Sequence, residues 1–467
     1  MFDIHMLPAD HGDCLWLTFG DAQQPRHLLI DAGTTGTWPR LRTRILAERA
    51  RTGGRLHFEL FVVTHVDADH IGGAIKLLED CGPLGVTFGE VWFNGWTHLD
   101  NETPDVLGPM QGEALSALIA DHDFAWNERF ARRAVMVPDA GPLPRVTYAG
   151  MTLTLLSPTF ERLQALKPEW EATVVNAGLK PGAAYAVADV ETPSDALGED
   201  VEELADAAFA ADTTKPNGSS IAFIAEHDGK RVLFAADAHA DVLLDSLRRG
   251  PLADADRCAL DAFKLSHHGS RRNTSRALVE ALPARHYLVS TNGSQFGHPN
   301  PEAIARVAVY GPQRKALAFN YRTEFNEAWD SATRKLDWGL STRFGDAERG
   351  LVVRPRAGAR RAVRGSVADG RRARAARRFS RAGHAARSPG ASPARHGRSV
   401  DNLSCTNYAD VISSCLTCPR GRQMQANDIG QEERRQQRID LVLSVLAYSV
   451  ESVVVLAVIG IFFNLLA

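Results

Sequence analysis

One stretch of this sequence decides the fold, and it is Thr64-His65-Val66-Asp67-Ala68-Asp69-His70-Ile71-Gly72-Gly73. The apolar run before it, residues 60–63, predicts a buried strand, and residues 74–78 predict the opening of a helix. The stretch therefore lies where a strand gives way to a helix. In α/β folds the carboxyl ends of strands are where the chemistry is placed.

Several side chains in this stretch can bind a metal ion, namely His65, Asp67, Asp69 and His70. On an extended or turning backbone, side chains two and four positions apart can converge, and mixed imidazole and carboxylate ligands suit Zn²⁺, Mn²⁺ or Fe. The alternative is a polar turn with solvated acids. Such a turn needs neither two histidines nor the Gly72-Gly73 pair, which lets the backbone pass close to a crowded site.

The pattern His65-x-Asp67-x-Asp69-His70 resembles the metal-binding signature of the metallo-β-lactamase fold, in the version where aspartate replaces the second histidine. That version is typical of the hydrolase domain of the competence protein ComEC family and of phosphorylcholine esterases. The resemblance covers residues 1 to about 310 and implies an αββα sandwich. It includes His11-Gly12-Asp13-Cys14 and a second pattern ending at Asp31, whose family equivalent supports the metal site from behind the ligands.

Three later strands are predicted to end in groups that bind metals or phosphates. Residues 232–236 lead to Asp237, which would be costly to bury unless it is paired or bound to metal. Residues 263–265 lead to His267 and His268, and residues 286–290 are followed by His298. Residues 217–224 predict one more strand, with polar residues at its mouth.

The family resemblance implies two metal centres. Metal one would be held by His65, Asp67 and Asp237, and metal two by Asp69, His70, Asp237 and one of His267 or His268. The sequence does not decide between those two histidines. Many members of the fold have a third histidine for metal one where this chain has Asn217-Gly218-Ser219. Asn217 and Ser219 are thus expected beside the ligands, and metal one is expected to bind weakly or only with substrate.

Two divalent ions, Zn²⁺ or Mn²⁺, would polarise the substrate and lower the pKa of a bridging water. Asp69 is expected to be essential for turnover. Candidates for protonating the leaving group or contacting phosphate are Ser270, His298 and the histidine of the 267/268 pair that does not bind metal. A structural turn before proline is the alternative for His298.

The preferred reaction is hydrolysis of a phosphodiester in a nucleic acid, a nucleotide or a related ester, as the resemblance implies. The alternative within enzymes is a lactone or thioester hydrolase on the same metals. A second class is a non-catalytic, membrane-tethered binding module. The intact set of metal-binding residue types in this chain speaks against that class.

Charge divides the chain into two parts. Residues 354–467 contain nineteen arginines and eight acids, whereas the whole chain has a net charge of −3, so residues 1–353 are strongly acidic. That balance argues against broad attachment of residues 1–353, the predicted hydrolase domain, to nucleic acid. An insertion at about 160–215 has nine acids and no base between residues 189 and 212. It predicts a mobile loop or a poorly packed helix, either a lid or a solvated surface excursion.

The carboxy-terminal part has two predicted segments. Residues 354–436 form an Arg-rich linker that is expected to be disordered; it is an arm for anionic lipid or nucleic acid, a plain linker, or the product of a shifted reading frame. Cys415-x-x-Cys418 could hold half a zinc site, but a second close pair is missing. Residues 437–467 predict a transmembrane helix, with an amphipathic interaction helix as the alternative.

Three arginines precede the apolar segment, which predicts a membrane anchor with a cytoplasmic catalytic domain. Glu451 inside that segment weakens the prediction unless it is paired within a homo-oligomer. The scattered cysteines and the amino terminus, which has no signal-peptide pattern, also favour a reducing cytoplasm.

The remaining predictions concern local structure. The patterns predict a hairpin within residues 1–31, helices at 38–51 and from the metal loop to Cys81, a helical stretch at 110–135, and a strand at 151–156. His98 follows a predicted strand and turn. It is interpreted as a surface histidine, with approach to the metal site as the alternative.

Overall fold

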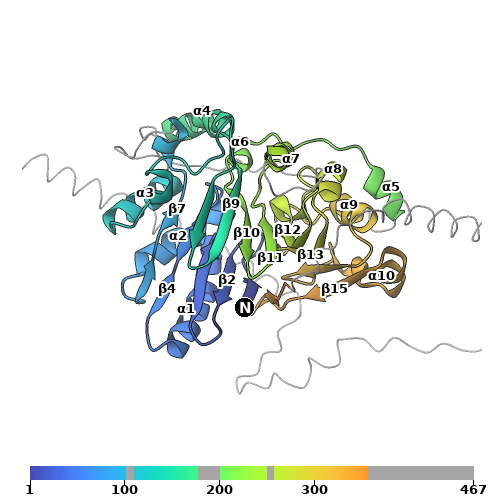
Figure 1. The fold of residues 1–467 in the computed structure, drawn as a ribbon, viewed down its shortest axis with the longest axis horizontal. Helices are drawn as coiled ribbons and strands as arrows, with labels where there is room; N and C mark the ends of the chain where they lie inside the picture. Colours follow the sequence, from blue (N-terminus) through green and yellow to red (C-terminus); the bar gives the residue numbers. More distant parts are fainter. Residues whose placement is uncertain (101–109, 177–199, 250–256, 356–467) are drawn as a thin grey trace, which may run out of the picture. The chain divides into compact units, whose positions relative to one another are not determined.

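A computed structural model of the chain describes residues 1–100, 110–176, 200–249 and 257–355. These residues form two large sheets that lie face to face (Figure 1). The first sheet has the strand order β16-β1-β2-β3-β5-β7. Its strands are β1 (Phe2–Met6), β2 (Leu15–Gly20), β3 (Pro25–Ile30), β5 (Leu60–Val62), β7 (Val91–Trp92) and β16 (Leu351–Val353).

The second sheet has the order β15-β14-β13-β12-β11-β10-β9-β8, and a small sheet pairs β4 (Leu56–Phe58) with β6 (Val86–Phe88). Strands β11 to β15 of the second sheet run parallel to one another, whereas β10 pairs with β11 in the antiparallel direction. The strands are β8 (Arg145–Tyr148), β9 (Met151–Ser157), β10 (Ala222–His227), β11 (Lys230–Phe234), β12 (Leu260–Lys264), β13 (Ala284–Val289), β14 (Lys315–Phe319) and β15 (Leu340–Phe344).

Helices cover the outer faces of both sheets (Figure 1). Those that belong with the first sheet are α1 (Trp38–Arg51), α2 (Ala68–Asp80) and α3 (Met110–Asp121). The others are α4 (Phe160–Asn176), α5 (Val201–Asp206), α6 (Lys215–Gly218), α7 (Ala240–Arg249), α8 (Arg276–Ala281), α9 (Pro301–Tyr310) and α10 (Ala332–Trp338). The predicted αββα sandwich is therefore present in residues 1–353.

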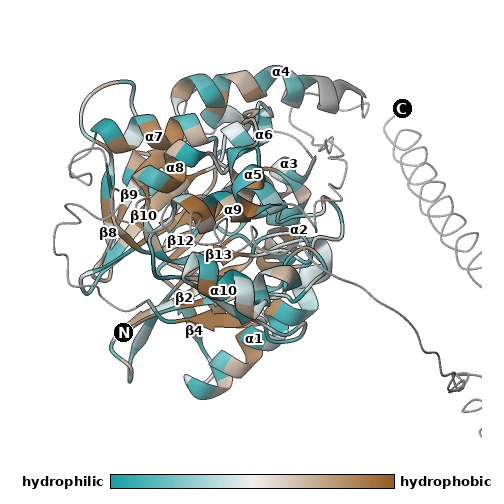
Figure 2. Cartoon of the chain, turned by 90° about the vertical axis from the view of Figure 1, so that its right-hand side faces the viewer, coloured by the Kyte–Doolittle hydropathy of each residue, from teal (hydrophilic) through white to brown (hydrophobic). Residues whose placement is uncertain are grey.

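Alternation along the strands explains the layers. In β2, Leu15, Leu17 and Phe19 face the second sheet and join the core between the sheets, whereas Trp16 faces the opposite way. Trp16 belongs to a separate core with Leu41 of α1 and the helices α2 and α3. The strands are accordingly apolar inside the molecule, and the polar residues lie on the outer surfaces of the helices (Figure 2).

The topology brings several strand ends to one place. In the first sheet β3 and β5 are parallel, and Asp31 and Thr64 follow them. In the second sheet β11, β12 and β13 are parallel, and Asp237, His267 and His298 follow those strands. Because the carboxyl ends of parallel strands meet at one edge of a sheet, the sandwich collects these polar residues at that edge.

Several predicted boundaries are wrong. Helix α2 begins at Ala68 and not at the predicted residues 74–78, so Asp69 and His70 lie in its first turn. The helical stretch predicted for 110–135 ends at Asp121. The strand predicted for 217–224 begins only at Ala222, because Lys215–Gly218 forms the short helix α6, which has a proline in its first turn.

The acidic insertion is better ordered than predicted where it is described. Helix α4 buries Leu163, Leu166 and Trp170, and α5 buries Val201 and Leu204. The prediction of a mobile loop or poorly packed helix is therefore wrong for residues 160–171 and for α5, whereas residues 207–211 are exposed and lie outside any helix or strand. The predicted linker from residue 356 to 436, the Cys pair and the segment 437–467 lie outside the described residues, and among the helices that are described none could cross a membrane.

Candidate metal centre

Asp31 is the buried carboxylate from which the site is built. It follows β3 in a left-handed conformation (φ 53°), which Asp tolerates better than most residues. Its Oδ1 accepts a hydrogen bond from the backbone N–H of Thr64 (2.7 Å), and its Oδ2 lies 2.8 Å from Nδ1 of His70. A carboxylate can only accept, so the Nδ1–H of His70 donates and its Nε2 faces the site.

His65 is oriented by the same carboxylate through one hydroxyl group. The Oγ1 of Thr64 donates to Asp31 Oδ2 at 2.8 Å and lies 3.0 Å from Nδ1 of His65. Because the hydroxyl hydrogen is used on Asp31, its oxygen is left to accept from His65 Nδ1–H. The Nε2 atoms of both His65 and His70 are thereby directed inward, as metal ligation requires.

His268 is oriented from the second sheet. Its Nδ1 lies 2.8 Å from the backbone oxygen of Ser290, which can only accept, so Nε2 again faces the site. His267 and His268 both have positive φ, 48° and 53°. Such a conformation is costly for residues other than glycine and persists where the surrounding structure enforces it, often at functional sites.

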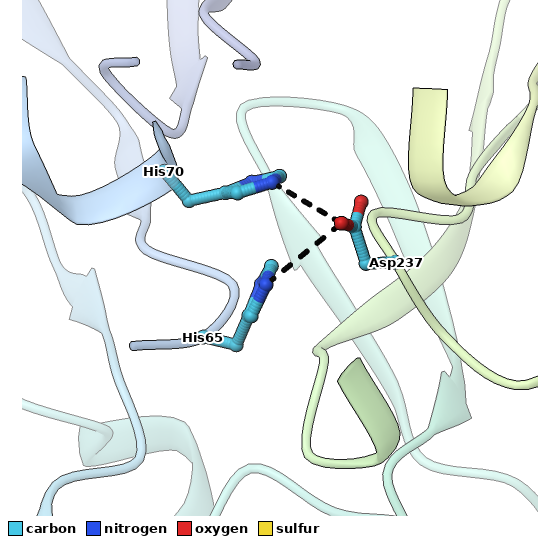
Figure 3. A group of neighbouring side chains, drawn as sticks. All are labelled: His65, His70 and Asp237. Atoms are coloured by element: carbon cyan, nitrogen blue, oxygen red, sulfur yellow. Dashed lines mark ion pairs between the residues drawn. The ribbon is translucent and has the colours of Figure 1, made fainter. Parts of the chain in front are cut away.

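The carboxylate of Asp237 lies opposite the rings of His65 and His70 (Figure 3). Its Oδ2 lies 4.0 Å from Nε2 of His65 and 3.4 Å from Nε2 of His70. On the other side it lies 3.6 Å from Nε2 of His268 and 3.9 Å from Nε2 of His267. One carboxylate oxygen is therefore surrounded by four imidazole nitrogens.

Three groups of the described residues have the spacing of metal ligands, and His70 belongs to each. They are His65, His70 and Asp237; Asp69, His70 and His268; and Asp13, Asp31 and His70. Asp69 Oδ2 lies 3.3 Å from His268 Nε2, whereas Asp67 Oδ2 lies 3.4 Å from His65 Nε2. Of the histidine pair that the sequence left open, His268 is thus the one that groups with Asp69 and His70.

Orphaned atoms show that the residues fit a metal. The Nε2 atoms of His65, His70 and His268 and Oδ1 of Asp237 are buried and have no hydrogen-bond partner among the described residues. Buried polar atoms are normally satisfied, so three orphaned Nε2 atoms within 4.0 Å of one carboxylate oxygen, Oδ2 of Asp237, indicate a ligand. Imidazole nitrogens with carboxylate oxygens are a donor set for divalent transition metals.

Without metal, the cluster holds protons. Burial disfavours the charged form of His268, but the carboxylates of Asp237 and Asp13 outweigh burial and raise its pKa to about 10. The pKa of His70 is likewise raised well above its usual value, by Asp237, Asp69 and Asp31 against burial. Burial would raise the pKa of Asp69, yet His70 and His268 hold it below its usual range. A metal ion entering the cluster must therefore displace protons.

Close packing of backbone also shapes the site. A Cβ atom on Gly73 would lie 2.1 Å from the backbone oxygen of Ala32, and one on Gly12 would lie 1.9 Å from that of Asp69. Only glycine fits at these positions. The close approach that the Gly72-Gly73 pair predicts is thus present in the structure.

The other sequence candidates lie around this cluster. Ser270 is buried, and its Oγ accepts from the N–H of Arg272, which holds the turn after the histidines. Ser219 Oγ donates to the backbone oxygen of Pro216, and Asn217 Nδ2 donates to Asp212. His298 is buried, and its ring centroid lies 5.1 Å from that of His267.

His298 and His98 are both buried, and burial lowers the pKa of each. Burial, with His267 and His268 nearby, holds the pKa of His298 well below its usual value, so this ring is neutral. His98 is fully buried, accepts from the N–H of Gly95 and packs against Trp126, so its interpretation as a surface histidine is wrong. Burial lowers its pKa to about 4.

Sequence reasoning did not assign some residues that line the cluster. Asp13 forms a buried ion pair with Lys264 (2.7 Å), and its other oxygen lies 3.5 Å from His268 Nδ1. Asp212, from the acidic insertion, and Asn273 lie against His267. Lys264, the last residue of β12, could have indicated such a partner in the sequence. A lysine at the end of an apolar strand needs a carboxylate nearby, because an unpaired buried lysine is costly.

The comparisons with known proteins agree with this geometry. Residues 24–293 match the family model of the metallo-beta-lactamase superfamily, which is more than half of the chain. The chain belongs to this superfamily. Its fold, its buried His/Asp clusters and this membership together make it a metal-dependent hydrolase that uses divalent ions.

Among solved structures, the chain is similar to a protein from Parabacteroides distasonis that is named as a metal-dependent hydrolase. The identity is 11%, the TM-score is 0.29, and the match covers 74% of this chain and 93% of the other. A search of curated proteins found no match. The metal, the number of ions and the substrate therefore have to be argued from the site.

Proposed function

We propose that this metallo-β-lactamase superfamily hydrolase cleaves phosphodiester bonds at a binuclear centre. The position of Asp237 carries the proposal. Its Oδ2 lies within 4.0 Å of imidazole nitrogens on both sides, so the one carboxylate can serve two ions. His65, Asp67 and Asp237 are assigned to one ion, and Asp69, His70, His268 and Asp237 to the other.

The donor set also supports a metal class. Three carboxylates, Asp67, Asp69 and Asp237, accompany the histidines, and the position of a third histidine for the first ion is taken by Asn217. Oxygen-rich sets with imidazole suit Mn²⁺ as well as Zn²⁺. Divalent ions at such a site supply Lewis acidity and acidify a coordinated water. The resemblance to the ComEC family and to phosphorylcholine esterases supports a phosphate ester as substrate.

The exposure of the histidines indicates the side from which a substrate reaches the site. The side chain of His267 is 19% exposed, whereas those of His65, His70 and His268 are fully buried. His267 is therefore the histidine that an entering substrate meets, and we assign to its Nε2 the transfer of a proton from the attacking water to the leaving group. His298 stands behind it as a neutral ring and limits access of water to that side.

The test uses the full chain with measured metal content. We expect close to two ions per chain after loading with Mn²⁺ or Zn²⁺, and hydrolysis of bis-p-nitrophenyl phosphate that stops on chelation and returns with metal. A lactone and a thioester are assayed beside it. Faster turnover of either would replace the phosphodiesterase assignment, and bound metal without turnover of any ester would favour a binding module.

Two variants separate the site from the fold. Asp237→Asn keeps the shape but removes the charge between the two groups, so turnover and the second ion should both be lost. Asp245→Asn is the matched control, because Asp245 is exposed and pairs with Arg248 on the surface of α7. Loss of activity in the control as well would show that the assay reports overall stability.

The wider setting is also a proposal. We infer from sequence alone that residues 437–467 attach the chain to a membrane, with the hydrolase on the cytoplasmic side and nucleic acid, nucleotide or a related ester as substrate. Fractionation of cells that produce the full chain or residues 1–436 tests the attachment. Both forms in the soluble fraction would contradict it.

A further inference from the structure

The acidic insertion delivers one carboxylate, Asp212, to the edge of the metal cluster. Asp212 is buried, and its two oxygens have separate partners. Oδ1 accepts from the N–H and the hydroxyl of Thr214, at 3.0 and 2.9 Å. Oδ2 accepts from the side-chain amides of Asn217 (2.7 Å) and Asn273 (3.0 Å) and lies 3.5 Å from Nδ1 of His267.

These contacts fix the orientation of one amide. A carboxylate only accepts, so Asn273 must turn its NH₂ group toward Asp212, and the same group also donates to the backbone oxygen of Asp237 at 3.2 Å. Its Oδ1 then faces Nδ1 of His267, at 3.1 Å. Asn217 Nδ2 lies 3.2 Å from the same Nδ1, but it donates to Asp212 over a shorter distance, 2.7 Å. Since an amide oxygen only accepts, the Nδ1–H of His267 donates to Asn273, and its Nε2 is left facing Oδ2 of Asp237, 3.9 Å away.

The arrangement repeats the one on the opposite side of the site. There Asp31 fixes His65 through the hydroxyl of Thr64. Here Asp212 fixes His267 through the amide of Asn273. In both cases a buried carboxylate on one element sets the tautomer of a histidine on another through a single polar side chain.

The segment that carries Asp212 is firmly attached. The guanidinium of buried Arg306 donates to the backbone oxygens of Arg271, Thr274 and Ala207, which joins the insertion to the turn after the histidines. The N–H of Asp212 donates to the backbone oxygen of Arg272 (3.1 Å), and Tyr310 of α9 is hydrogen-bonded to Asp206. The position of the carboxylate is therefore determined by several independent contacts.

We propose that Asp212 is a positioning residue for the hydrolytic site, which acts through Asn273 to hold His267 with Nε2 toward the substrate. The insertion is then part of the active site. This inference rests on the proposed function for the role of His267 in turnover, but the orientation of the ring can be measured without turnover.

The decisive variant is Asp212→Asn, which is nearly isosteric. An amide at position 212 presents an NH₂ group to Asn273. We expect Asn273 to rotate to accept from it, which gives up its 3.2 Å bond to the backbone oxygen of Asp237, and to turn its own NH₂ toward His267. Nδ1 of His267 then accepts, and the proton moves to Nε2. The ring nitrogens are observed by NMR on the full, Zn²⁺-loaded chain with ¹⁵N-labelled histidine, with His267 assigned by its absence in His267→Gln.

The expected NMR result is the Nδ1–H form of His267 in the parent chain and the Nε2–H form in Asp212→Asn. Metal content should be the same in both. Identical His267 signals in the two proteins would overturn the proposal, whatever ester the enzyme hydrolyses. Asp241→Asn is the matched control, because Asp241 pairs with Arg162 nearby but its side chain is 62% exposed, and its spectrum should equal the parent's.

Kinetics test whether Asp212 acts through His267. With bis-p-nitrophenyl phosphate we expect Asp212→Asn to lower kcat by about 10- to 100-fold, as loss of a carboxylate behind a site histidine usually does, with little change in KM. Added to His267→Gln, the same change should have no further effect. Independent, multiplying losses in the double variant would overturn the role in turnover, as a general structural defect would produce them.

Discussion

Asp31 Oδ2 and His70 Nδ1 lie 2.8 Å apart at the centre of a fully buried contact between the end of β3 and the first turn of α2. The same oxygen accepts from Thr64, which holds His65. One carboxylate thus fixes two histidines that we assign to different ions. Asp31 acts by orienting these rings, because neither of its oxygens is among the buried atoms without a hydrogen-bond partner.

Replacement of Asp31 should weaken metal binding without moving the ligands far. Asp31→Asn tolerates the left-handed backbone but cannot accept from Thr64 and His70 with both oxygens, so we expect metal affinity to fall by about 10- to 100-fold. Equilibrium dialysis with Zn²⁺ measures the change. Asp21→Asn, in the exposed turn between β2 and β3, is the control and should bind as the parent does. Unchanged affinity in Asp31→Asn would remove the orienting role.

The two neighbouring histidines should differ in metal content. His268 groups with Asp69 and His70, so His268→Gln should lose about one ion per chain by elemental analysis. His267 is held by Asn273 at the more exposed side, so His267→Gln should keep both ions and lose turnover instead. The reverse pattern would exchange their assignments.

The sequence predicted the parts of the site that are close together along the chain. His65, Asp69 and His70 share one strand-to-helix junction, and their residue types alone indicate a metal. Asp237 and the histidine pair were visible because a charged or imidazole side chain directly after a buried strand needs a partner. The resemblance joined these separate signals into one site.

Other parts could not be predicted because they depend on distant pairing. Asp212 lies among many acids in an Ala-rich insertion, and composition does not distinguish one buried carboxylate from solvated neighbours. The choice of His268 over His267 depends on two unusual backbone conformations. The early start of α2 was also not predicted. Asp67 is its N-terminal cap, but its side chain makes no capping hydrogen bond.

Metal binding should strengthen as pH rises. The pKa of His268 in the metal-free cluster is raised to about 10, and that of His70 is raised as well, so both are protonated at neutral pH. A metal ion needs the neutral rings and must release these protons. We expect the apparent affinity to rise between pH 6 and pH 9, by about tenfold per pH unit for each proton released.

Calorimetry in buffers of different ionisation enthalpy counts those protons directly. The parent chain should release more protons per ion than His268→Gln, whose missing imidazole has none to give. An affinity that is flat over this range, or that falls as pH rises, would mean that the histidines are already neutral in the metal-free protein.

Asp13 and Lys264 form a buried ion pair, so removal of one charge should leave the other in the interior without a partner and destabilise the fold. Both side chains are buried, with 2.7 Å between Nζ and Oδ2, and Lys264 with His268 outweighs burial and lowers the pKa of Asp13 to about 2. The pair is therefore fully charged at neutral pH. Lys264→Met leaves the carboxylate buried without its cation, and we expect a loss of about 3–5 kcal/mol in the free energy of unfolding.

The double variant Asp13→Asn with Lys264→Met should recover part of that loss, because no isolated charge remains in the interior. Urea unfolding of the metal-free chain measures both, which keeps release of metal out of the comparison. Lys230→Met, which breaks the pair with the exposed Asp228, should change stability by no more than about 0.5 kcal/mol. If the double variant is less stable than Lys264→Met alone, Asp13 stabilises the fold mainly through His268, whose Nδ1 it approaches to 3.5 Å.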